Sequence, residues 1–195
     1  MIAKEFLTVA LFTISVVITP FASQAQPGGH VPRIGYLGTS SASLEAELVK
    51  AFREGLREHG YVEGENIVIE YRWAEGNYQR FPALVADLVK SKVDLILTAG
   101  TPGALAAKRA TQTIPIVMAV TGDAVATGLV SSLARPGGNL TGLTTMVPDL
   151  EGKRLEILRQ VLPKLVTVAV LLNTSNPLTA VQWEQTKTSA KALGI

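Results

Sequence analysis

One stretch of the chain limits the possible folds more than any other: an apolar run, then a turn of small residues, then an alanine-rich segment. Residues 93–99 are mostly aliphatic or β-branched, and such a run predicts a short buried strand. Gly100, Thr101 and Pro102 follow, and residues 104–110 favour a helix. Thr101 is a candidate N-cap, and Pro102 suits a first helical turn because its missing N–H would have no partner there. The stretch therefore predicts a strand, a tight turn and a helix.

The same unit recurs along the chain. Strands are predicted at residues 33–37, 66–73, 115–120 and 139–145, and helices at residues 44–56, 81–89 and 125–134. Strands that alternate with helices predict an α/β fold with a doubly wound parallel sheet and right-handed crossovers. The strand order expected for such a sheet is 2-1-3-4-5.

The first predicted helix has an apolar residue at every fourth position. These residues are Leu44, Leu48, Phe52 and Leu56, and Gly60 ends the pattern. Spacing of this kind indicates one face of an amphipathic helix, which we expect to pack on the sheet.

Composition excludes several classes of function. The chain has 47% hydrophobic and 17% charged residues, which suits a sheet buried on both faces. It has no cysteine, so disulfides, cysteine–zinc sites and thiol catalysis are excluded. His30 and His59 lie far apart and lack neighbouring ligand residues, so we expect neither a metal nor another cofactor. A net charge of +2 without a basic block argues against a nucleic-acid partner.

Motifs of catalysis are also missing from the sequence. There is no G-x-S-x-G elbow, no P-loop and no G-x-G-x-x-G after the first predicted strand. We therefore expect a binding protein and not an enzyme.

The N-terminus resembles a secretion signal. Lys4 precedes the apolar residues 6–18, and the small residues Ser23 and Ala25 predict cleavage after Ala25. The run is shorter than the roughly 20 residues of a membrane span, although a retained anchor is the alternative. Residues 1–25 are thus a predicted signal peptide for the periplasm.

The rest of the chain is predicted to form one lobe and part of another. After the Pro/Gly-rich leader 26–32, residues 33–145 are the predicted first lobe. Beyond them we expect a helix at 155–162, a strand at 167–172 and a helix at 177–193. A single unit of this kind cannot bury its own sheet faces. It either extends the first sheet or begins a second lobe.

Three predicted turns follow strands and contain small, hydroxyl-bearing or acidic residues. Ligands of open parallel sheets bind beyond the carboxyl ends of the strands, where helix N-termini present free N–H groups. Each hydroxyl has an alternative role as a helix cap, and Asp123 suits either a cap or a partner for a ligand ammonium or hydroxyl. Trp73 either stacks on a ligand or packs at the domain edge. The candidate ligand residues are Thr39, Ser40, Ser41, Gly100, Thr101, Pro102, Thr121 and Asp123.

Several segments resemble the tryptophan/tyrosine-type periplasmic substrate-binding proteins of ABC transporters. They read IGYLG at 34–38, FREGLR at 52–57, GYVEGENI at 60–67, EYRWAEG at 70–76, TAGTP at 98–102 and SLARPGGNLTG at 132–142. The last of these runs is the most specific. The resemblance covers the chain from residue 32 to about residue 193.

The resemblance implies a type I periplasmic-binding-protein fold, in which two lobes joined by hinge crossovers close on a small ligand. It assigns residues 146–195 to a hinge crossover and an incomplete second lobe, with Asn173 and Asn176 facing the cleft. The first hinge would lie near residues 143–148. The chain then resembles a C-terminally truncated copy, which we expect to bind ligand weakly or not at all by itself.

The implied function is the extracytoplasmic solute-binding component of an ABC importer. Its ligand would be a small polar solute, with amino acids as candidates, and its partners would be permease subunits of the inner membrane. We expect a monomer. The alternatives are a ligand-binding sensor domain of a membrane receptor and a non-functional truncated paralogue.

Overall fold

The fold is taken from a computed structural model of the chain, which describes residues 30–145 and 150–195. The predicted signal peptide, its cleavage site, most of the predicted leader and part of the predicted hinge lie outside the described residues. Within the part that the structure describes, no helix is both long and apolar enough to cross a membrane.

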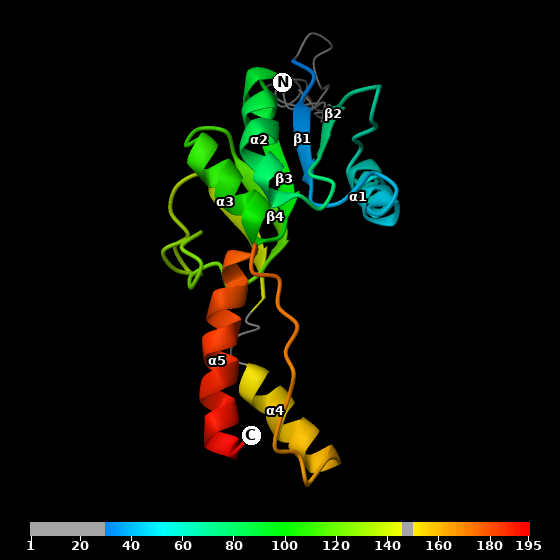
Figure 1. The fold of residues 1–195 in the computed structure, drawn as a ribbon. Helices are drawn as coiled ribbons and strands as arrows, with labels where there is room; N and C mark the ends of the chain where they lie inside the picture. Colours follow the sequence, from blue (N-terminus) through cyan, green and yellow to red (C-terminus); the bar gives the residue numbers. More distant parts are fainter. Residues whose placement is uncertain (1–29, 146–149) are drawn as a thin grey trace, which may run out of the picture. The chain divides into compact units, whose positions relative to one another are not determined.

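A single sheet of five parallel strands organises residues 33–144, which lie in the predicted first lobe (Figure 1). Its order, β2-β1-β3-β4-β5, confirms the predicted fold class and the predicted 2-1-3-4-5 arrangement. The strands are β1 (Arg33–Gly38), β2 (Val68–Trp73), β3 (Leu95–Ala99), β4 (Ile116–Thr121) and β5 (Leu140–Thr144).

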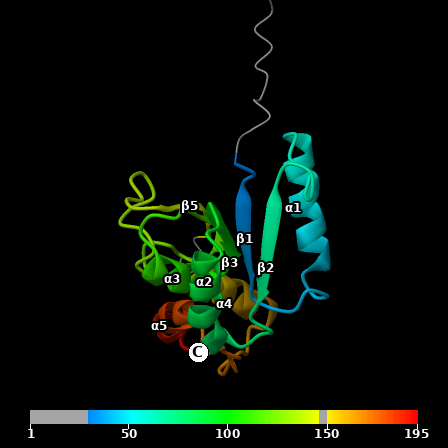
Figure 2. The ribbon, with the colours of Figure 1, turned by 90° about the horizontal axis from the view of Figure 1, so that it is seen from above.

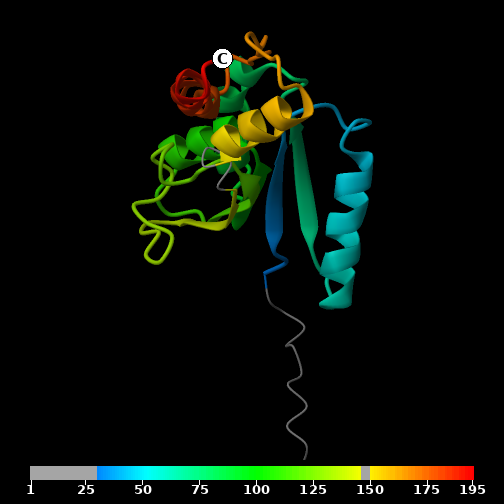
Figure 3. The ribbon, with the colours of Figure 1, turned by 90° about the horizontal axis from the view of Figure 1, so that it is seen from below.

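Helices lie on both faces of this sheet. Figures 2 and 3 show α1 (Ala46–Glu58) along one face, and α2 (Phe81–Lys90) and α3 (Thr101–Ala110) along the other. A short 3-10 helix, η1 (Tyr78–Arg80), leads directly into α2. The doubly wound architecture therefore forms as the alternating pattern predicts.

Alternation along each strand divides the core into two layers, because successive side chains point to opposite faces. Leu37 and Ile96 belong to the layer that includes residues of α2 and α3. Their strand neighbours Tyr36 and Leu97 belong to the other layer, with Val49 of α1. Buried aliphatic side chains therefore pack against both faces of the sheet.

The buried face of α1 differs from the prediction. Leu44 and Leu48 are 79% and 62% exposed, whereas Glu45 and Val49 are buried and Phe52 is half-buried. Successive residues of a helix are rotated by about 100°. The buried positions 45 and 49 lie one residue after the predicted ones, so Leu44 and Leu48 point away from the sheet. The predicted helix forms over Ala46–Glu58, but its predicted inner face is wrong at positions 44 and 48.

The helix predicted at residues 125–134 does not form. Residues 124–130 make successive turns, in which the N–H groups of Leu129 and Val130 both donate to the Ala124 carbonyl, at 2.8 and 3.0 Å. Gly128 has a φ of +71°, in the left-handed region that interrupts a helix. Leu129 and Val130 nevertheless remain buried, which explains the apolar pattern that suggested a helix.

The C-terminal part contains α4 (Glu151–Val161) and α5 (Pro177–Leu193), which contact each other. The strand predicted at residues 167–172 does not form, and these residues pair with none of the described strands. Leu171 is fully exposed. A strand is stabilised by hydrogen bonds to a neighbour, and this segment has no such neighbour among the described residues. It therefore does not extend the first sheet.

Candidate functional site

The three predicted turns meet at the carboxyl edge of the sheet. Parallel pairing of β1 with β3, and of β3 with β4, places the ends of these strands side by side. The Gly100 N–H donates to the Val120 carbonyl at 2.7 Å. A Cβ at Gly100 would lie 3.7 Å from Cγ2 of Thr39. The structure thus brings residues of the three strand ends together, as the topology predicts.

A carboxylate that the sequence analysis did not select organises the turn after β1. Glu45 is only 6% exposed and precedes α1. Its Oε1 accepts hydrogen bonds from Thr39 Oγ1 at 3.1 Å, from the Ser40 N–H at 2.7 Å and from Ser40 Oγ at 2.9 Å. Its Oε2 accepts from the Tyr36 hydroxyl at 3.0 Å. The turn is therefore built around Glu45.

These bonds keep Glu45 ionised. Burial by itself would raise the pKa of Glu45, but the bonds from Ser40, Tyr36 and Thr39 outweigh it and lower the pKa below its usual value. Burial and the same carboxylate raise the pKa of Tyr36 well above its usual value, so the hydroxyl remains a donor.

Ser41 lies at the end of this turn, outside the Glu45 group. Its hydroxyl lies 3.0 Å from that of Ser43 and accepts weakly from the Leu44 N–H at 3.4 Å. Ser41 thus has the local capping role that was the alternative for each hydroxyl.

The turn after β3 combines a left-handed glycine with a helix N-terminus. Gly100 has a φ of +79° and is the N-cap of α3, so the prediction that Thr101 is the N-cap is wrong. Pro102 lies in the first helical turn, as predicted. Thr101 is 1% exposed, and its Oγ1 is a buried oxygen without a hydrogen-bond partner in the described structure. A buried hydroxyl without a partner costs free energy of folding, so its presence here calls for an explanation.

The turn after β4 uses its polar groups locally. The buried Thr121 hydroxyl lies 3.7 Å from Sδ of Met118. Asp123 Oδ1 accepts from the N–H groups of Val125 and Ala126 at 3.0 and 2.9 Å. Asp123 therefore has the capping role expected as one of its two alternatives, although it caps a turn and not a helix. It is half-buried.

The two predicted second-lobe residues also cap their own segment. Asn173 is exposed and accepts from the Ser175 N–H at 3.0 Å. Asn176 is the N-cap of α5 and accepts from the Leu178 N–H at 3.1 Å. Neither side chain has a described hydrogen bond to the turns after β1, β3 or β4.

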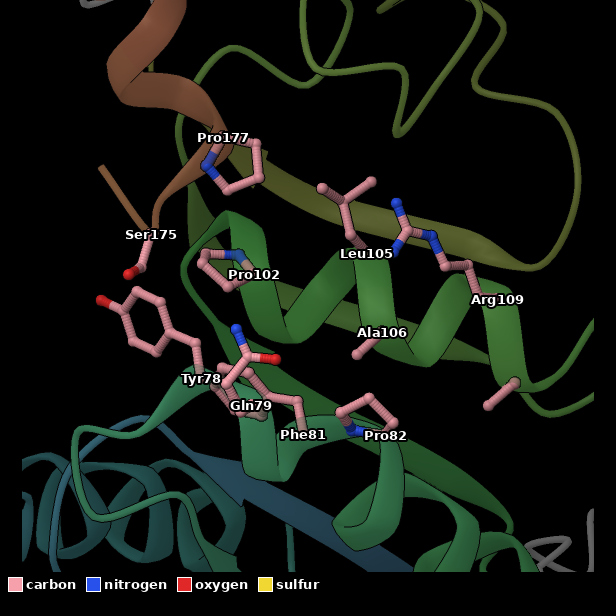
Figure 4. Close-up of a pocket in the computed structure, with 11 residues that line it drawn as sticks. Tyr78, Gln79, Phe81, Pro82, Pro102, Leu105, Ala106, Arg109, Ser175 and Pro177 are labelled. Carbon is pink, nitrogen blue, oxygen red and sulfur yellow. The ribbon is translucent and has the colours of Figure 1, made fainter. Parts of the chain in front are cut away.

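Of the ten candidate residues, only Pro102 lines the cavity shown in Figure 4. This cavity of about 420 Å³ lies beside η1, α2 and α3. On α3 it contacts Leu105, Ala106 and Arg109, on the side opposite to the buried Ala104 and Ala107. Its other lining residues are Tyr78, Gln79, Phe81, Pro82, Ala110, Ser175 and Pro177. Through Pro102 it adjoins the turn after β3, but no other residue of the three turns lines it.

Sequence reasoning missed Glu45 because it is one of two acids near the start of α1, and nothing local distinguishes it from Glu47. The available signal was an acid placed a few residues after Thr39 and Ser40, whose hydroxyls lacked an obvious partner. Trp73 packs against Gly38, where a Cβ would collide with its ring, which favours the packing alternative for this residue.

Comparison with known proteins decides the family. A family model described as ABC transporter substrate binding protein matches residues 40–195. The chain belongs to the ABC transporter substrate-binding protein family. Over 142 residues, 73% of the chain, it is 35% identical to a tyrosine-binding protein of Clostridioides difficile.

Solved structures of several proteins share the fold of this chain. A conserved domain protein from Vibrio cholerae superposes with a TM-score of 0.76 at 28% identity. An ABC domain from Streptococcus pneumoniae, solved in complex with L-Trp, superposes with a TM-score of 0.74, also at 28% identity. A leucine-binding protein from Thermotoga maritima shares the fold at 15% identity, with a TM-score of 0.63.

The relatives are longer than this chain. Alignment to the first two structures covers 85% of the chain but 55% of each of theirs, and alignment to the tyrosine-binding protein covers 41% of that protein. The chain thus spans about half the length of the substrate-binding proteins that it matches.

Proposed function

We propose that this chain supplies the first-lobe half of a solute-binding site in the extracytoplasmic component of an ABC importer. The observation that carries the proposal is the turn after β3, where the N-terminus of α3 and the unpartnered Thr101 hydroxyl occur together. A helix N-terminus favours an anionic group, because its free N–H groups and dipole point toward it. Thr101 would add a hydroxyl donor.

The proposed ligand class is the zwitterionic amino acids. A carboxylate suits the N-terminus of α3, whereas the acidic Glu45 and Asp123 follow the neighbouring strands and favour a cationic group. Support also comes from the relatives, one named as tyrosine-binding and one solved with L-Trp. The proposed site residues in the described first lobe are Thr39, Ser40, Ser41, Gly100, Thr101, Pro102, Thr121 and Asp123.

Two further proposals concern the setting of the protein. Cleavage after Ala25 would release the mature chain into the periplasm as a monomer, where permease subunits would be its membrane partners. Asn173 and Asn176 would contribute from the second lobe. In this role the protein binds and delivers a solute and catalyses no reaction.

Saturation-transfer NMR tests the proposal, because it detects the weak binding expected of half a site. We would compare L-Trp with tryptamine, which lacks the carboxylate, and with indole-3-propionate, which lacks the ammonium. L-Trp should give the strongest transfer. Equal transfer to all three ligands would indicate indole binding without recognition of the amino-acid group, and would contradict the proposal.

A further inference from the structure

Glu45 is a buried anion held by neutral donors. Its partners are two hydroxyls and one N–H of the turn, together with the Tyr36 hydroxyl. No lysine or arginine among the described residues forms an ion pair with it. The hydrogen bonds satisfy the carboxylate oxygens, but the negative charge is not neutralised by a cation.

The Glu45 carboxylate lies in an enclosed position. A Cβ at Gly38 would lie 2.8 Å from Oε2 of Glu45 and would collide with the Trp73 ring. Tyr36 is buried, and its ring centroid lies 5.3 Å from that of Trp73. The glycine and the two aromatic rings thus enclose the carboxylate, and any other residue at position 38 would displace it.

Glu45 also determines which hydrogen bonds the turn after β1 can form with a ligand. A hydroxyl has one proton and two lone pairs. Thr39 and Ser40 donate their protons to Glu45, so their oxygens are left as acceptors. The Ser40 N–H is also occupied. The turn after β1 therefore cannot donate to an anionic ligand group through these atoms, but it can accept from an ammonium.

We propose that Glu45 is the positioning residue that makes the turn after β1 the cation-accepting side of the solute site. This inference rests on the proposed function. Glu45 acts through Thr39 and Ser40: it orients their hydroxyl oxygens toward the ligand and supplies negative charge behind them. Thr39 lies against Gly100, so the accepting turn adjoins the anion-binding N-terminus of α3.

Two substitutions separate the charge of Glu45 from its geometry. Glu45→Gln retains an oxygen that can accept from Thr39 and Ser40, while its amide nitrogen can donate to Tyr36, but it removes the charge. Glu45→Ala removes both the charge and the bonds. The mature chain, residues 26–195, would be titrated with L-Trp and with indole-3-propionate, and shifts of the Ser40 amide would be followed by NMR.

Glu45→Gln should leave the Ser40 amide shift close to its original value. It should weaken L-Trp binding roughly tenfold, because the negative charge behind Thr39 and Ser40 is lost, and leave indole-3-propionate binding unchanged or improved. Glu45→Ala should shift the Ser40 amide and weaken both ligands. A merely structural role for Glu45 would instead make Glu45→Gln affect both ligands equally, and that result would overturn the proposal.

If the proposed function is wrong, the titrations give a different result from the one that a structural role for Glu45 gives. In that case the unsubstituted chain binds neither ligand, and the Ser40 amide alone tests the role of Glu45 in holding the turn. An unchanged Ser40 amide in Glu45→Ala would overturn that role as well. A shifted amide in Glu45→Ala, with an unshifted one in Glu45→Gln, would support it.

Discussion

The Ser40 N–H lies 2.7 Å from Oε1 of Glu45, in the turn where we expected Ser40 to face a ligand. The serine and threonine side chains of this turn are therefore part of a structural network before any ligand binds. What they can present to a ligand is a pair of acceptor oxygens, with the negative charge of Glu45 nearby. The Thr39 and Ser40 hydroxyls are therefore available to a ligand as acceptors and not as donors.

Thr101→Val should separate folding from binding. The Thr101 hydroxyl has no described partner, so replacing it with a methyl group should leave the free energy of unfolding unchanged or raise it. L-Trp binding should weaken, because the ligand loses a donor. Urea denaturation and ligand titration measure the two quantities.

Thr98→Val is the matched control for Thr101→Val. The Thr98 hydroxyl donates to the Leu37 carbonyl at 3.1 Å in the buried sheet. Its loss should lower the free energy of unfolding by about 1 kcal/mol. If Thr101→Val destabilises as much as Thr98→Val, the Thr101 hydroxyl has a structural partner and is not reserved for a ligand.

Gly38→Ala should destabilise the first lobe by about 1–3 kcal/mol, because the added methyl group would collide with Trp73 and Glu45. Gly55→Ala is its control. Gly55 lies inside α1 with open space around it, so alanine there should stabilise by up to about 1 kcal/mol. Thermal denaturation of both variants checks this, and equal effects would contradict the enclosed carboxylate site.

Acid should weaken the fold through Glu45. Its pKa is lower in the folded chain than in the unfolded chain, so the unfolded state takes up a proton first as the pH falls. The stabilisation is fully present above the unfolded-state pKa of about 4.3 and is lost as the pH falls through the lower folded-state pKa. Denaturation curves between pH 7 and pH 3 measure this loss.

The Glu45→Gln variant identifies which part of that pH dependence belongs to Glu45. Glutamine does not titrate in this range, so the variant should lose less stability between pH 5 and pH 3 than the original chain. Identical pH dependence in the two chains would show that other carboxylates account for it.

The corrected inner face of α1 predicts unequal effects at neighbouring positions. Leu48→Ala should change stability by no more than about 0.5 kcal/mol, because Leu48 is exposed. Val49→Ala should cost about 1–2 kcal/mol, because Val49 is buried against the sheet. A larger loss of stability in Leu48→Ala than in Val49→Ala would instead support the inner face predicted from the leucine spacing.

Local patterns predicted the sheet well. Strands β1, β3 and β4 are short, mostly apolar runs that end in small residues, and these features depend only on neighbouring residues. The alternation with helices then determined a parallel, doubly wound arrangement. The order of β1, β3 and β4 brought the three turns together, and no side-chain detail was needed for that prediction.

Predictions failed where distant contacts decide the structure. Residues 125–134 have helical spacing, but Asp123 caps a turn, Gly128 interrupts it, and burial of Leu129 and Val130 requires no helix. Glu45 was missed because its burial depends on the fold around Gly38, although its spacing from Thr39 and Ser40 was visible in the sequence. The unpartnered Thr101 hydroxyl is likewise a property of burial, which the sequence does not reveal.

The central claim is that the turns after β1, β3 and β4 form the first-lobe half of a solute site. The most direct measurement is a titration of isotope-labelled mature chain with L-Trp, followed through every assigned backbone amide. We predict saturable shifts centred on Thr39, Gly100 and Thr101. Saturable shifts centred instead on Leu105 and Arg109, beside the cavity of Figure 4, would contradict the claim.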